Sequence, residues 1–323
     1  MKKILKSKLA PYIKGLLEEL KVTGGTLCST SVSTLYLFDN FIITNNFDNG
    51  ELSQSLVEAW SIQRNTENKN VRNARISVIR RLANYMNSLG KDTYYPPMLG
   101  SCEYSKPYIP TRKELKLFFK TIDEDEPYYP YLKHMKYTYS VLFRLYYCLG
   151  LRRSEGVMLT REDVNLGKGT IYIRHSKGDK DRILYIRDDI KEMLSEFDAY
   201  IQNEIIPDRK WFFIRADKTD HLLKNSVSKK FHYFWLKAFP KWAGKRPTTH
   251  SLRHAFVVHR INDWVEEGNK AEGLLPYLSK FLGHSSISET MYYYHSFDTE
   301  TKAYSRFIEN DSLLFKEVSE WLN

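Results

Sequence analysis

The feature that most limits the possible folds of this chain is a break in its hydrophobic pattern between Asp92 and Arg112. Proline and glycine interrupt any periodic pattern there, at Pro96, Pro97, Gly100, Pro107 and Pro110. Patterned sequence stands on both sides, which is typical of a linker between two domains. A length of 323 residues also favours two domains over one or four. We therefore expect one domain over residues 1–95, a linker over 96–110 and a second domain over 111–323.

Helical periodicity characterises the first of these domains. Between residues 71 and 89, apolar side chains recur at the spacing of one helix face. These side chains are Ile76, Ile79, Ala83 and Met86. Arg72 and Arg75 fall near this stripe, and the pattern gives no packing partner for them. The sequence thus predicts a small helical domain.

The second domain combines helical patterns with one hairpin. Thr111 and Glu114 fit a capping box at the start of its first helix. Residues 170–175 and 182–186 alternate as strands around turn residues. Further helical patterns cover residues 133–149, 189–205, 224–239, 250–265 and 273–282. The predicted fold class is therefore mainly α, with a small antiparallel β-sheet in the second domain.

The charge balance favours a polyanionic partner. Lys and Arg number 49 against 39 Asp and Glu, giving a formal net charge of +10, which suits nucleic acid or an acidic membrane surface. No apolar run approaches the roughly 20 residues of a membrane span, and none follows the basic residues 2–8 as a signal peptide requires. Cys28, Cys102 and Cys148 form no CxxC pair, which predicts reduced thiols. We expect a basic, cytoplasmic protein without a membrane segment.

Four separated segments carry side chains suited to phosphate chemistry. They are residues 150–155 (GLRRSE), Lys177 in the hairpin turn, residues 250–253 (HSLR) and residues 282–295. Each is weak by itself, because a single surface arginine or lysine is usually a solvated charge and adjacent tyrosines often only pack. His250 and His254 have the spacing of a zinc helix, but the glutamate of that motif is absent. Only the ordered set indicates a function.

Taken in order, these segments resemble the tyrosine recombinases, the phage integrase and Xer family. The catalytic domain of that family carries Arg, Lys, His-x-x-Arg, His and Tyr in this order. The matching residues are Arg152, Lys177, His250, Arg253, His284 and Tyr293. The resemblance covers most of residues 111–295, and the family's nucleophile follows the last histidine by nine residues. That spacing selects Tyr293 rather than Tyr292 or Tyr294. Arg153 beside Arg152 leaves open which guanidinium points inward.

The resemblance implies that Tyr293 attacks DNA and forms a 3′-phosphotyrosine. A covalent intermediate conserves the bond, so that strands can be rejoined without ATP. The guanidiniums of Arg152 and Arg253 can clamp phosphate oxygens bidentately, a geometry that lysine does not offer. His284 is expected to donate a hydrogen bond to the phosphate. His250, one helical turn from Arg253, is the better candidate for proton handling near the tyrosine.

Two further roles follow from the same resemblance. Lys177, rather than Lys180, is expected to protonate the departing 5′-oxygen from the tip of the hairpin. Glu155 is expected to support the arginine and histidine geometry without binding phosphate. No carboxylate cluster suits a two-metal mechanism, so the sequence implies neither a metal nor another cofactor.

The expected protein is thus a site-specific DNA recombinase built as a two-domain DNA clamp. Its first domain looks like the helical, SAM-like core-binding half of these proteins, and its second like their catalytic domain. The resemblance implies double-stranded DNA with inverted-repeat core sites as partner and a homotetramer on two sites. Three alternatives are disfavoured. The local sequence of residues 250–253 and 282–295 disfavours a type IB topoisomerase. The retained reactive groups disfavour a DNA-binding relative that has lost catalysis. The lack of a basic amphipathic segment disfavours a protein that binds anionic membranes.

The C-terminal tail adds one more expectation. Ser312 can cap a short helix whose apolar residues fall on one stripe. The stripe consists of Leu314, Val318, Trp321 and Leu322. Two interpretations remain open: the tail helix folds back onto its own domain, or it docks on a neighbouring protomer, as C-terminal segments do in relatives of the family.

Overall fold

The computed structural model of the chain describes residues 4–23, 29–97, 100, 106–127, 129, 132–174 and 181–296. The chain divides into two compact units, residues 1–105 and 106–323. Each unit buries a hydrophobic cluster of its own. The division falls inside the stretch that the proline and glycine residues mark in the sequence.

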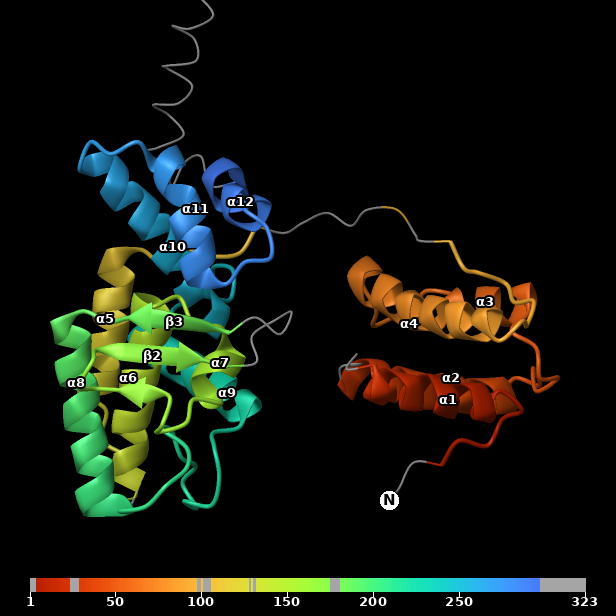
Figure 1. The fold of residues 1–323 in the computed structure, drawn as a ribbon, viewed down its shortest axis with the longest axis horizontal. Helices are drawn as coiled ribbons and strands as arrows, with labels where there is room; N and C mark the ends of the chain where they lie inside the picture. Colours follow the sequence, from red (N-terminus) through yellow and green to blue (C-terminus); the bar gives the residue numbers. More distant parts are fainter. Residues whose placement is uncertain are drawn as a thin grey trace, which may run out of the picture. The chain divides into compact units, whose positions relative to one another are not determined.

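The first unit is built of helices (Figure 1). Its described helices are α1 (Ala10–Val22), α2 (Ser29–Thr44), α3 (Gln54–Ser61) and α4 (Lys69–Ser88). The other three pack against α4, the longest of them. Ser53 caps α3 and Asn68 caps α4, each accepting a backbone N–H three residues on. The predicted helix over residues 71–89 is confirmed, and its apolar stripe is buried.

Arg75, which the sequence left without a partner, is buried on α4. Its guanidinium forms a two-pronged ion pair with Glu67, with Nε–Oε1 and Nη2–Oε2 distances of 2.9 and 2.7 Å. It also lies over the ring of Trp60, with its central carbon 4.9 Å from the ring centroid. Glu67 precedes α4 and Trp60 lies on α3, so Arg75 ties the two helices together.

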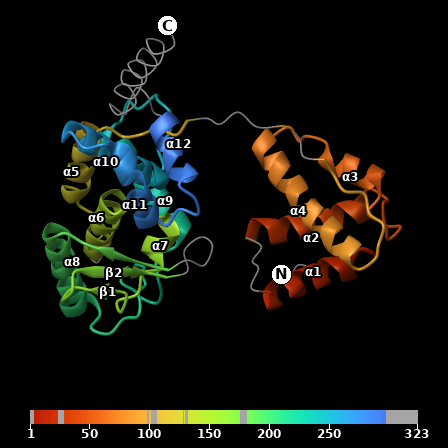
Figure 2. The same ribbon diagram turned by 45° about the horizontal axis from the view of Figure 1, so that its top comes forward.

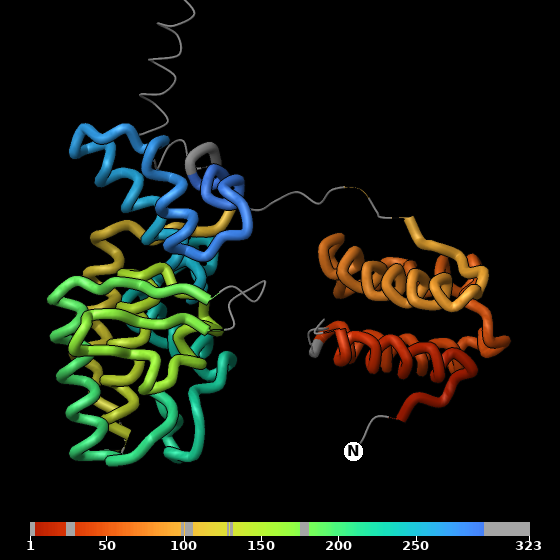
Figure 3. The backbone as a smooth tube through the Cα atoms, in the orientation of Figure 1, coloured from red at the N-terminus to blue at the C-terminus, as the bar shows by residue number. Residues whose placement is uncertain are grey.

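The second unit holds helices and one small sheet. In chain order its described elements are α5 (Arg112–Asp123), α6 (Lys133–Cys148), α7 (Arg153–Val157), β1 (Val164–Asn165), β2 (Thr170–Ile173), β3 (Arg182–Tyr185), α8 (Asp188–Tyr200), the π-helical turn η2 (Ile201–Ile205), α9 (Lys224–Ala238), α10 (Thr249–Glu266), α11 (Ala271–Leu282) and α12 (Ser288–Ser296). The strands pair antiparallel in the order β1-β2-β3, with Ile171 opposite Leu184. The backbone tube of Figure 3 shows β2 and β3 as neighbouring runs. The predicted fold class is confirmed.

An aromatic core joins the helices of this unit. The rings of Phe118 on α5, Phe143 on α6 and Phe231 on α9 contact one another, with centroids 5.1–5.9 Å apart. The capping box of Thr111 and Glu114 is present and begins α5. α10 packs against α6 and also against α11 and α12. Figures 1 and 2 both show α10, α11 and α12 gathered at one end of the unit.

Two glycines in the left-handed region turn the chain where the site forms. Gly150 links α6 to α7 with φ +58°, and a Cβ there would lie 2.7 Å from Phe256 and 2.8 Å from Leu282. Gly283 ends α11 with φ +64°. Only glycine adopts such a conformation at little cost, and at Gly150 only glycine leaves room for α10 and α11.

Most sequence-based bounds agree with the structure within two residues, and two differences are instructive. The first predicted strand ends at Ile173 rather than at residue 175. The predicted helix over residues 189–205 changes after Tyr200 into a wider π turn, closed by a hydrogen bond from Ile206 N to Ile201 O of 2.8 Å. Pro207 explains the ending, because the residue before a proline is pushed out of the helical region and Ile206 is extended. The hairpin turn 175–180 and the tail helix expected from residue 312 lie outside the described residues.

Candidate active site

The structure brings together five of the six residues that the sequence predicts as catalytic. They are Arg152 beside the start of α7, His250 and Arg253 on α10, His284 after α11, and Tyr293 on α12. Glu155, predicted to support them, lies on α7. Lys177 lies outside the described residues, and its position stays a prediction.

The C-terminal end of α11 organises the arginines. The last carbonyls of a helix lack partners within it and form the negative end of its dipole, so cations are stabilised there. Three successive carbonyls, those of residues 281–283, each accept a hydrogen bond from a different arginine. Arg182 Nε donates to Phe281 O (2.8 Å), Arg253 Nη2 to Leu282 O (2.9 Å), and Arg152 Nη2 to Gly283 O (2.8 Å). Arg152 and Arg253 are therefore held on adjacent carbonyls.

Arg253 is the more deeply buried member of the predicted pair, with 1% of its surface exposed. Its Nη1 donates to Gly150 O at 2.5 Å, which joins α10 to the turn before α7. Burial, together with the neighbouring charge of Arg152, lowers the pKa of Arg253 to about 10. The guanidinium nevertheless remains charged at neutral pH.

Glu155 accepts hydrogen bonds from two arginines. Its carboxylate receives the backbone N–H of Arg152 at 2.8 Å and Arg152 Nη1 at 3.0 Å. Arg182 approaches the same carboxylate with both terminal nitrogens, at 3.0 and 2.9 Å. Burial alone would raise the pKa of Glu155, but the hydrogen bond and charge of Arg182 outweigh it and lower that pKa to about 2. The carboxylate therefore stays ionised throughout the physiological range.

Arg153 points to a different place from Arg152. Its Nη1 donates to the hydroxyl of Ser228 on α9. Arg152, by contrast, contacts Glu155 and the end of α11. Arg152, and not Arg153, makes the contacts with Glu155 and the end of α11, so Arg152 stays the predicted phosphate ligand.

The phenol of Tyr293 is buried and hydrogen-bonded. Tyr293 has 5% of its surface exposed, and its hydroxyl lies 2.8 Å from Nδ1 of His254. The ring of His284 is parallel to the phenol, with a centroid distance of 6.4 Å and an interplanar angle of 2°. Burial raises the pKa of Tyr293, although the positive charge of Arg253 works in the opposite direction. The free protein therefore holds the phenol in its neutral form.

The histidines of the site are neutral. Burial, reinforced by the nearby positive charge of Arg253, lowers the pKa of His250 and of His284 to about 4. Burial and its neighbour His250 lower the pKa of His254 to about 3. The sequence-based hypothesis gave proton handling near the tyrosine to His250, but the phenol hydroxyl of Tyr293 is hydrogen-bonded to His254. His250 contacts His254, with ring centroids 4.3 Å apart.

Sequence reasoning missed two residues of this cluster. His254 was weighed as a zinc ligand and was given no catalytic role, although it directly follows Arg253 and shares one helix face with His250. Arg182 was considered only as the first residue of a strand. A charged residue there is usually solvent-facing, and nothing in the local pattern reveals that it reaches Glu155, which is 27 positions earlier.

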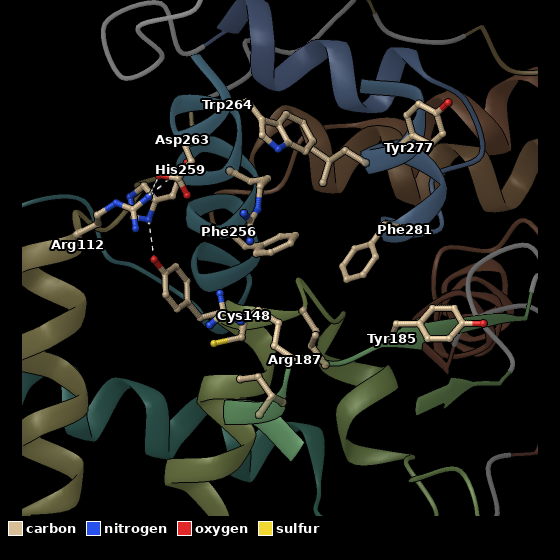
Figure 4. Close-up of a pocket in the computed structure, with 15 residues that line it drawn as sticks. Arg112, Cys148, Tyr185, Arg187, Phe256, His259, Asp263, Trp264, Tyr277 and Phe281 are labelled. Carbon is tan, nitrogen blue, oxygen red and sulfur yellow. Dashed lines mark hydrogen bonds and ion pairs between the residues drawn. The ribbon is translucent and has the colours of Figure 1, made fainter. Parts of the chain in front are cut away.

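A cavity of about 470 Å³ lies outside the arginine cluster (Figure 4). Phe256, Tyr277 and Phe281 supply much of its apolar lining. His259 contributes a hydrogen bond between its Nδ1 and the hydroxyl of Tyr147, 3.0 Å apart. Among the described residues that line this cavity there is no member of the predicted catalytic set, so it is a separate feature.

The parts of the chain that the structure describes offer neither a grouped set of metal ligands nor a helix that could span a membrane. No three His, Cys, Asp or Glu side chains within those ranges are grouped as metal ligands. None of the helices in the same ranges is long and apolar enough to cross a bilayer.

The part of the chain that holds the candidate site is similar in sequence to known proteins. The model of the phage integrase family matches residues 111–300. The tyrosine recombinase XerA of Thermococcus kodakarensis is 31% identical over 156 residues, which cover 46% of this chain and 48% of that protein. A putative integrase/recombinase of Sinorhizobium fredii is 23% identical over 265 residues, covering 76% of this chain and 80% of that protein. The chain thus spans about half the length of the first of these curated relatives.

The fold of the chain is similar to the folds of solved structures. The XerH site-specific recombinase bound to palindromic difH substrate has a TM-score of 0.62 and 18% identity, and the match covers 82% of this chain and 74% of that one. A lambda integrase dimer bound to a COC′ core site has a TM-score of 0.61 and 13% identity, with coverage of 88% and 76%. At these identities the likeness concerns the fold alone.

Proposed function

Because the chain belongs to the phage integrase family, we propose that it is a site-specific DNA recombinase that cleaves and rejoins strands through a 3′-phosphotyrosine at Tyr293. The observation that carries this proposal is the pair Arg152 and Arg253, held on adjacent carbonyls at the end of α11. The buried phenol lies in the same cluster, on α12, which packs against α10 and α11.

The arginine pair stabilises the transition state. Attack on a phosphodiester spreads negative charge over the phosphate oxygens, and donors that are already fixed need not reorganise to meet it. The carbonyls that hold Arg152 and Arg253 supply this fixation. His284 is held by a contact of 2.7 Å between its Nδ1 and the hydroxyl of buried Thr290. With Nδ1 accepting from that hydroxyl, Nε2 carries the proton and donates to the phosphate.

The phenol must lose its proton to attack, and the histidines provide the acceptor. A neutral His254 accepts a hydrogen bond from Tyr293, which favours the neutral phenol before DNA binds. The scissile phosphate brings a negative charge into the cluster. That charge raises the pKa values of His254 and His250 and so makes them better proton acceptors. Proton removal is in this way tied to the presence of the substrate.

DNA binding involves both units in this proposal. Unit 1, residues 1–105, acts as the core-binding half of a clamp on double-stranded DNA with inverted-repeat core sites, and unit 2 acts as the catalytic half. The net charge of +10 supports contacts to the phosphate backbone. Four protomers assemble on two sites, with the tail from Ser312 as the candidate link between neighbours. The protein acts in the cytoplasm and uses neither metal nor cofactor.

Covalent trapping tests the proposed function. The full chain is incubated with a library of nicked duplexes in which a cut releases a short fragment, so that rejoining is prevented. We expect protein to remain attached after denaturation to a limited set of sequences that share an inverted repeat. Relaxation of supercoiled DNA without any target sequence would instead support a topoisomerase. Absence of covalent product on every duplex, with DNA binding intact, would leave only a silent DNA-binding relative.

Lys177→Ala should slow cleavage by about 10²- to 10⁴-fold, because the departing 5′-oxygen then lacks its general acid. Replacing the 5′-bridging oxygen with sulfur should restore most of the rate, since a thiolate leaves without a proton. Single-turnover cleavage of the two substrates measures this difference. Lys180→Ala is the matched control and should cleave both substrates at the rate of the unmodified protein. A Lys177→Ala protein that sulfur does not rescue would place the general acid elsewhere.

A further inference from the structure

Arg182 stands at the first position of β3 and reaches into the arginine cluster. We propose, on the basis of the function above, that Arg182 is a positioning residue: its guanidinium binds both carboxylate oxygens of Glu155 and thereby leaves Arg152 able to bind the scissile phosphate. The sequence-based hypothesis gave Arg182 no role in the chemistry.

The contacts of Arg182 are those of a structural cation. Its side chain is 9% exposed. The two terminal nitrogens bind the two oxygens of Glu155, and Nε binds the carbonyl of Phe281. The guanidinium is thus directed at a carboxylate and a helix end through all of its nitrogens. This geometry is bidentate, which a lysine cannot reproduce.

Glu155 is the bridge between Arg182 and Arg152. Its side chain is only 3% exposed, so its negative charge needs a cation close by. Oε1 accepts from Nη1 of both arginines, each at 3.0 Å, while Oε2 accepts from Arg182 Nη2 and from the backbone of Arg152. Without Arg182, the carboxylate would lose the two hydrogen bonds of that guanidinium and would draw Arg152 closer. A two-pronged pair with Glu155 would then compete with the phosphate for the same guanidinium.

Gly283 supplies an independent sign that this place is shaped for Arg182. At its φ of +64° a Cβ would lie 2.9 Å from Arg182 Nη1. The carbonyl of the same residue holds Arg152. The turn after α11 therefore makes room for one arginine and orients the other.

The test is a double-mutant cycle in single-turnover cleavage of a nicked duplex. Arg182→Lys keeps the charge but loses the fork, and it should reduce cleavage by about 100-fold, the cost of a small misplacement of a catalytic group. Arg152→Lys should reduce it by at least as much. The double variant should be no slower than Arg152→Lys within about twofold, because the two changes act on one interaction. Arg153→Lys is the matched control and should cleave at the unmodified rate.

A second substrate separates positioning from general support of the fold. In a methylphosphonate at the scissile position, a methyl group replaces one charged oxygen, so less charge has to be held. The losses in Arg152→Lys and in Arg182→Lys should both shrink on this substrate, and by similar factors. A role of Arg182 in stability alone predicts equal losses on both substrates and a lower Tm.

Glu155→Gln provides the other arm of the experiment. In that background the carboxylate is gone, so adding Arg182→Lys should cost less than about twofold. If the rate losses of the two single variants multiply in the double variant of either cycle, the proposed role of Arg182 is wrong. It is also wrong if Arg182→Lys loses the same factor in rate on the phosphate and on the methylphosphonate substrate. These outcomes differ from a failure of the proposed function itself, because in that case the unmodified protein would give no covalent product at all.

Discussion

Tyr293→Phe should remove all covalent protein–DNA product while DNA affinity stays within about twofold of the unmodified protein. The substitution deletes the phenol oxygen that forms the bond to phosphorus, and no substitute nucleophile has the same position. It also deletes the hydrogen bond to His254, a loss of about 1 kcal/mol in the free energy of unfolding. Electrophoresis of labelled nicked duplex after denaturation measures the adduct, and a binding titration measures affinity.

The neighbouring tyrosines are the controls for this experiment. Tyr292→Phe and Tyr294→Phe also remove a phenol oxygen from α12, yet both variants should form the adduct. Adduct formation by Tyr293→Phe, with its loss in one of the neighbours, would transfer the nucleophile to that neighbour and break the nine-residue spacing from His284.

Arg152→Lys should reduce cleavage by about 100- to 1,000-fold, the cost of losing one donor to a developing oxyanion. Charge is preserved, so binding of intact DNA should change little. The lysine cannot at once contact Glu155, the carbonyl of Gly283 and a phosphate oxygen as the guanidinium does. Single-turnover rates at saturating protein measure the effect separately from affinity.

Arg153→Lys is the matched control, with the same chemical change one position along the chain. Its contact with Ser228 involves neither Glu155 nor the carbonyls at the end of α11, so cleavage should remain within about twofold. A fully active Arg152→Lys protein beside an inactive Arg153→Lys protein would reverse the assignment of the two guanidiniums.

Much of the fold was predictable because it depends on local patterns. The stripe on α4, the capping box before α5 and the alternation of β2 and β3 are each visible within a few turns of chain. The π turn at the end of α8 was not predictable in this way, because it depends on the backbone conformation just before Pro207. The contacts of Arg75 with Glu67 and Trp60 were likewise not predictable, because they depend on the packing of α3 on α4.

The candidate site was predictable as a set of residues but not as a geometry. His250 and His254 share one face of α10, and sequence cannot say which of them meets the phenol. That choice depends on where α12 lies, which three-dimensional packing decides. The bond between Arg182 and Glu155 joins a strand to a short helix and has no local signal. Ordered motifs therefore indicated the chemistry, while the partners that orient it required the structure.

The meeting of three arginines at the end of α11 has a thermodynamic consequence. Three guanidiniums and one carboxylate meet there, and the neighbouring histidines are neutral, so the site carries excess positive charge that is largely shielded from water. The pKa of Arg253, lowered to about 10, reflects that cost. A phosphate diester supplies the compensating negative charge. Folding and DNA binding are thereby linked, and the free energy of unfolding rises with the concentration of any anion that occupies this site.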